Sequence, residues 1–82
     1  MLAQEISLTG VVVNIDSNEP LPGVTLLIKA TSKGTTTNFE GDFNINIKIG
    51  DTLVASYLGM KTQELLVLSS PVSIVMQSDS DQ

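Results

Sequence analysis

The chain has 82 residues, with nine acidic and four basic side chains, so its formal net charge is −5. A chain of this length is expected to form one small domain with a thin core, too small for an enclosed active site. Cysteine and histidine are both absent, which excludes thiolate nucleophiles, disulfides, cysteine metal sites and histidine acid–base chemistry. All basic residues are lysines, and the acidic balance excludes nucleic acid as a partner.

The hydrophobic fraction is 41% and the charged fraction 16%, a balance typical of a globular chain. No apolar run approaches the roughly 18 residues of a membrane-spanning helix, so membrane insertion of this segment is not expected. Residues 1–5 are interpreted as a remnant of an export signal with a cloning start, because Leu-Ala-Gln is a small-residue context typical of signal cleavage. The alternative is a native Met1 in a cytosolic protein.

Glycine and proline divide the chain into regular short pieces, and alternating apolar and polar residues fill them. This spacing is typical of an all-β sandwich or barrel. About seven strands are therefore expected between residues 6 and 77, with 78–82 as a polar linker toward a downstream domain. The expected strands cover residues 6–14, 24–29, 34–38, 43–49, 53–58, 61–68 and 72–77.

Several strands have a predictable place in the sheets. Residues 43–49 alternate strictly and predict a half-buried strand with one wet face. Residues 53–58 are apolar on both faces, which is typical of a central strand. Residues 34–38 are polar and β-branched, which suits a short edge strand that adds little to the core. The tight turn at Gly41 then predicts a hairpin over residues 35–49.

The first strand predicts one candidate interaction surface. Alternation from Leu8 puts Gly10 and Val12 on the inner face and leaves an outward apolar stripe: Val11, Val13 and Ile15. A loop or a neighbouring strand can cover such a stripe. Alternatively, the stripe is a docking surface for a partner or a neighbouring domain.

The polar edge strand predicts a second candidate surface, formed by Thr35, Thr36 and Thr37 and continuing to Asn38. An edge strand can pair its backbone with an added strand from a partner. It can equally remain a solvated edge, and the sequence leaves both alternatives open.

Metal binding and catalysis are not expected. Asn38, Glu40 and Asp42 alternate around Gly41 as in a calcium loop, but Gly41 comes too early for the EF-hand pattern and no bidentate glutamate follows at the required offset. No cofactor is indicated. The carboxylate pairs lie in one turn or in the tail, without the burial that tunes a general acid, so the chain is not expected to be an enzyme.

Sugar binding is not expected either, because Phe43 and Tyr57 fit core patterns and only Phe39 remains as a candidate exposed aromatic face. Structural roles are expected for the turn and close-packing residues Gly10, Pro22, Gly23, Gly41 and Gly59. Pro22 fixes φ and Gly23 permits a positive φ, which lets Leu21 tuck under the sandwich.

Four segments in order carry a resemblance to a known family: residues 8–13 (LTGVVV), 19–24 (EPLPGV), 34–43 (GTTTNFEGDF), and 53–59 with 61–64. They resemble the carboxypeptidase-regulatory-like domain at the N-terminus of SusC/RagA-type TonB-dependent outer-membrane receptors of Bacteroidetes. The resemblance covers nearly the whole chain. It implies a seven-stranded antiparallel or mixed β-sandwich, Ig-like or prealbumin-like, on the periplasmic face of the outer membrane and without a zinc site.

For function, the resemblance implies a non-catalytic periplasmic extension of a glycan or peptide receptor, acting as a protein-interaction or spacer module. The implied partner is a TonB-type energising protein or the adjacent plug and barrel. The alternative is the same sandwich as a stabilising or anchoring module of a secreted peptidase or a surface adhesin. The chain departs from the family at Val11 and Val13, where a polar residue is usual, and at Met60, where an aromatic residue is usual.

Overall fold

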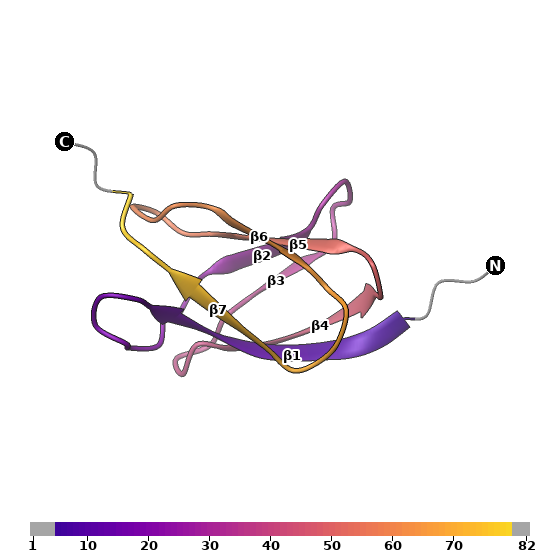
Figure 1. The fold of residues 1–82 in the computed structure, drawn as a ribbon, viewed down its shortest axis with the longest axis horizontal. Coiled ribbons are helices and arrows are strands. Elements are labelled where there is room, and N and C mark those ends of the chain that lie inside the picture. The colour runs from indigo at the N-terminus through magenta and orange to yellow at the C-terminus, as the bar shows by residue number, and fades with distance from the viewer. Residues whose placement is uncertain (1–4, 80–82) are drawn as a thin grey trace.

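The computed structural model describes residues 5–79, which contain seven strands and no helix (Figure 1). The strands are β1 (Glu5–Asn14), β2 (Thr25–Ile28), β3 (Gly34–Thr36), β4 (Asp42–Lys48), β5 (Thr52–Ser56), β6 (Gln63–Leu66) and β7 (Val72–Met76). Across this range no helix is long and apolar enough to cross a membrane. Of the predicted export remnant, only Glu5 is among the described residues, and it begins β1. Of the predicted linker, the part beyond Asp79 lies outside the described residues.

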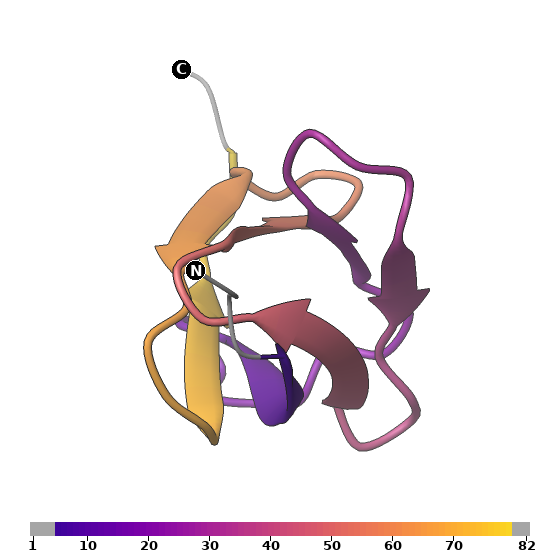
Figure 2. The ribbon, with the colours of Figure 1, turned by 90° about the vertical axis from the view of Figure 1, so that its right-hand side faces the viewer.

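The strands form two layers, a three-stranded sheet in the order β4-β1-β7 and a four-stranded sheet in the order β3-β2-β5-β6 (Figures 1 and 2). β1 is antiparallel to β4 and parallel to β7, whereas all pairs of the second sheet are antiparallel. The predicted all-β sandwich with mixed pairing is confirmed. So are the interior position of β5 and the edge position of β3.

The predicted hairpin over residues 35–49 is wrong. β3 pairs with β2 and β4 pairs with β1, so the connection between β3 and β4 crosses from one sheet to the other. The turn itself is tight, because the Asn38 N–H donates to the Asp42 carbonyl at 3.0 Å. Just before the turn, the Thr37 N–H donates to the Val24 carbonyl at 3.1 Å, which holds this side of the turn to the β2 layer.

The core lies between the two layers and is built from the inward positions of both sheets. Its buried members are Leu8, Val12, Val24, Leu26, Ile28, Phe43, Ile45, Ile47, Leu53, Ala55, Val67, Ile74 and Met76. Because they recur at every second position within the strands, they give each sheet one apolar face, and the two apolar faces pack together. Leu21 packs against this core, as predicted, and Gly23 has the expected positive φ of 79°.

The two ends of the sandwich carry different loops (Figure 1). We call the end where β1 begins the N-terminal end; it holds the turns at residues 29–33 and 49–51 and the start of the connection from β6 to β7. The opposite end, where β7 finishes, is the C-terminal end; it holds residues 14–23 and the turns at 38–41 and 57–60.

Candidate interaction surface

The two surfaces predicted from the sequence meet at one hollow of about 850 Å³. Its lining includes Val11 of β1 together with Thr35 and Thr36 of β3. β3 and β4 are edge strands of opposite sheets and lie on the same side of the sandwich (Figure 2), and β4 contributes Asp42 and Asn44 to the lining. The structure thus joins what the sequence predicted as two separate surfaces.

The rest of the apolar stripe lies beyond the hollow. Val13 is half-buried: Pro20 forms a bridge with it on one side, and Val75 of β7 is its registered partner on the other. Ile15 is 56% exposed, and Val75 is also exposed. The stripe therefore extends onto β7 at Val75. This residue was missed from the sequence, because only the parallel pairing of β1 with β7 puts it beside Val13.

Thr37 does not belong to any surface, because the residue is only 6% exposed. Its hydroxyl donates to the Leu21 carbonyl at 2.6 Å and accepts from the Val24 N–H at 2.9 Å. The hydroxyl thereby satisfies two backbone groups where the chain enters β2. The expectation of an exposed Thr37 fails because this position continues the inward-facing alternation of β3.

We expect Thr37→Val to lower the free energy of unfolding by about 2 kcal/mol, because valine fills the same space but leaves the Leu21 carbonyl and the Val24 N–H without their partner. Urea unfolding followed by circular dichroism measures the change. Thr36→Val is the matched control, because Thr36 is exposed and the same substitution there removes no hydrogen bond of this kind. A loss no larger than that of the control would show that the bridge contributes little.

The loop considered for calcium binding is organised by the side chain of Asn38. The Asn38 side-chain oxygen accepts from the Glu40 N–H at 2.9 Å and from the Asp42 N–H at 3.0 Å. This Asx turn engages the amide oxygen that a calcium loop would need. Among residues 5–79, no group of three or more acidic side chains is placed to hold a metal ion.

The three aromatic side chains are divided between the core and a turn tip, and Leu58 stands on a second turn tip. Phe43 is buried and Tyr57 is half-buried, as predicted, whereas Phe39 is 91% exposed. Leu58 is 96% exposed at the tip of a turn that the Met60 N–H closes by donating to the Tyr57 carbonyl at 3.0 Å. Sequence reasoning placed Leu58 in a strand; the glycine that follows it was the signal for a turn tip.

Comparisons with known proteins agree on one kind of relative. The CarboxypepD_reg-like domain family matches residues 8–81. The TonB-dependent receptor P3 of Formosa agariphila is 35% identical over 82 residues, and the TonB-dependent receptor SusC of Bacteroides thetaiotaomicron is 34% identical over 79 residues. These alignments cover 98% and 96% of this chain, which spans only 8% of the length of either relative.

Proposed function

We propose, since this chain belongs to the CarboxypepD_reg-like domain family, that it is the periplasmic N-terminal extension of a TonB-dependent outer-membrane receptor. The observation that carries the proposal is similarity to such receptors over nearly the whole chain. The receptor's cargo is proposed to be a glycan or a peptide. Further matching relatives from Formosa agariphila are also named TonB-dependent receptors, which favours this role over an accessory module of a peptidase or an adhesin.

Within that receptor, the proposed role is that of a non-catalytic interaction module. The hollow offers hydroxyl and amide groups beside an apolar wall, and the free edges of β3 and β4 adjoin it. Such a surface is suited to a protein segment that adds to an edge strand and places side chains in the hollow. The proposed partner is a TonB-type energising protein, or the plug and barrel of the same receptor. A spacer role is the alternative.

The test is a nuclear magnetic resonance titration of the ¹⁵N-labelled domain with the periplasmic C-terminal domain of a TonB protein. We expect amide shifts that are localised to the hollow, around Val11 and residues 35–38. The double substitution Val11→Thr and Val13→Thr is expected to weaken binding by about tenfold, because it removes apolar contact area from the stripe. Both valines are half-buried on the outer face, so the melting temperature should change little.

A second titration with the plug domain of the receptor separates the two proposed partners. Shifts with only one of them identify that one as the partner. No shifts with either protein would contradict the interaction role and favour a spacer. A large loss of stability in the Val11 and Val13 variant would instead mean that the stripe belongs to the core.

A further inference from the structure

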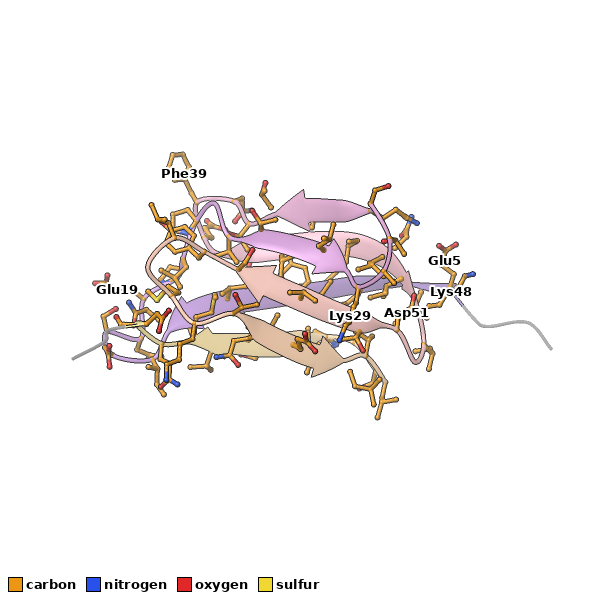
Figure 3. All side chains as sticks on the ribbon, turned by 90° about the horizontal axis from the view of Figure 1, so that it is seen from above. Glu5, Glu19, Lys29, Phe39, Lys48 and Asp51 are labelled. Atoms are coloured by element: carbon orange, nitrogen blue, oxygen red, sulfur yellow. The ribbon has the colours of Figure 1, made fainter. Side chains whose placement is uncertain are left out.

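Two large apolar side chains stand on turn tips at the C-terminal end of the sandwich. Phe39 and Leu58 are 91% and 96% exposed, so neither packs against this domain. Figure 3 shows Phe39 projecting from this end, away from Lys29 and Lys48 at the other. Turn tips usually carry small or polar residues, so two large apolar side chains that are almost fully exposed on turn tips form a candidate contact site.

Both turns are held by their own hydrogen bonds before any partner arrives. The Gly41 N–H donates to the Asn38 carbonyl at 2.9 Å, which closes the turn that carries Phe39. The Met60 N–H closes the turn of Leu58, and the Asp79 N–H donates to the Gly59 carbonyl at 3.0 Å, which ties that turn to the segment after β7. The backbone of a preorganised turn loses little conformational entropy on binding.

The charges around these two side chains are strongly one-sided. Among residues 5–79, the loops of the C-terminal end hold the carboxylates of Asp16, Glu19, Glu40 and Asp79 against one lysine, Lys61. Glu40 follows Phe39 directly in the chain, and the Asp79 hydrogen bond places that residue beside the turn of Leu58. A partner at this end therefore meets a negative potential.

The N-terminal end differs in charge but also exposes apolar side chains. There Lys29 pairs with Glu64 at 3.3 Å and Lys33 pairs with Glu5 at 3.5 Å. Lys48 and Asp51 also lie at this end (Figure 3), so its charges balance. Leu66 and Leu68 are exposed there. This end therefore supplies a control with two exposed leucines, less exposed than Phe39 and Leu58, and no net charge.

We propose that the C-terminal end of the sandwich docks a cationic protein segment with apolar side chains, and that Phe39 and Leu58 are its anchors. The inference rests on the proposed interaction function and names a second surface, apart from the hollow, and the chemistry of its partner. The carboxylates select this occupant: they repel a second copy of the same end and an anionic lipid surface, and a neutral apolar partner would desolvate them without compensation.

The test uses a synthetic peptide in which lysine and leucine alternate with serine spacers, and a second peptide with glutamate in place of lysine. Titration of the ¹⁵N-labelled domain with the lysine peptide is expected to shift amides at 39–41, 57–60 and 78–79. Raising the salt from about 50 to about 500 mM should weaken binding several-fold, because it screens the carboxylates. The glutamate peptide is expected to cause no shifts.

The anchor variant carries Phe39→Ser and Leu58→Ser, and the matched control carries Leu66→Ser and Leu68→Ser at the N-terminal end. The anchor variant is expected to bind the lysine peptide at least about tenfold more weakly, whereas the control binds as the parent does. All four side chains are exposed, so both variants should fold. Equal effects of the two variants, or shifts spread over the whole surface, would overturn the proposal.

Further measurements separate this inference from the proposed function and from other occupants. If the TonB domain shifts amide signals around the hollow and the lysine peptide shifts none at the turns, the interaction function is supported and the second surface is contradicted. If the lysine peptide binds at the turns while neither the TonB domain nor the plug binds anywhere, the second surface stands and the proposed partners fail. Self-association that the anchor variant abolishes would mean that the partner is a second copy of the domain. Binding to phosphatidylglycerol vesicles would mean that the partner is a membrane. Either result would contradict a cationic segment as the partner.

Discussion

Gly10→Ala is expected to lower the free energy of unfolding by about 3 kcal/mol, because no space exists for a Cβ at this position in β1. The added atom would lie 2.6 Å from the Phe43 ring and 2.6 Å from the Val72 carbonyl oxygen. Phe43 is the registered partner of Gly10 in β4, and Val72 is its registered partner in β7. Alanine would therefore force apart the central strand of the three-stranded sheet and both of its neighbours.

A companion variant distinguishes the two clashes. Phe43→Leu removes the ring that an added Cβ would meet but leaves the Val72 carbonyl oxygen in place. In the Phe43→Leu background, Gly10→Ala should therefore lower the free energy of unfolding by less than in the parent, but still measurably. Urea unfolding of the four proteins gives this comparison. Thr9→Ala is the control for the strand itself, because Thr9 is the exposed neighbour of Gly10. If Gly10→Ala lowers the free energy of unfolding no more than Thr9→Ala does, β7 moves away from β1 easily.

The contrast between the strands and the hairpin shows what the sequence can predict. All seven strands were predicted because alternation, β-branched composition and bounding turn residues are local properties of each segment. The predicted hairpin was wrong because pairing is not local: turn residues such as Asn38 and Gly41 specify a tight turn, but not whether the next strand stays in the same sheet. The competing partners are the preceding strand β2 for β3 and the distant strand β1 for β4, and the turn residues specify neither of them.

The candidate surfaces were less predictable than the strands for the same reason. Val11 and Thr35 are half-buried and lie outside the buried core, but their meeting at one hollow depends on how the two sheets stack. Thr37 was misplaced because a threonine fits an exposed edge as well as a buried bridge between backbone groups. Polar identity alone does not specify burial when a backbone group is available to pair with it.

The family resemblance is confirmed, and its basis explains why it predicts the fold better than the site. Its segments centre on turn and close-packing residues, among them Gly10, Gly23, Gly41 and Gly59. The last three have positive φ, which a backbone turn requires whatever the domain binds. The outward residues Phe39 and Leu58 meet no such requirement, so their roles have to be inferred from exposure and charge.

Gly41→Ala is the second substitution for which we expect a large effect, a loss of about 3 kcal/mol, because backbone strain and close packing act together there. Gly41 has a φ of 76°, and an added Cβ would lie 2.7 Å from the Val12 carbonyl oxygen and 3.2 Å from the Leu21 nitrogen. These two atoms form a 2.9 Å hydrogen bond with each other. Alanine would therefore strain the turn and also disturb the bond that attaches the chain before β2 to the central strand.

Gly59→Ala separates the two contributions. Gly59 has a φ of 81°, nearly that of Gly41, but an added Cβ would meet no atom within 4 Å. Its replacement should therefore cost only the backbone strain, about 1 kcal/mol. Urea unfolding of the two variants gives the cost of close packing at Gly41 as the difference between them. Equal losses would mean that the segment around Leu21 yields to a methyl group and that the turn requires glycine for its φ alone.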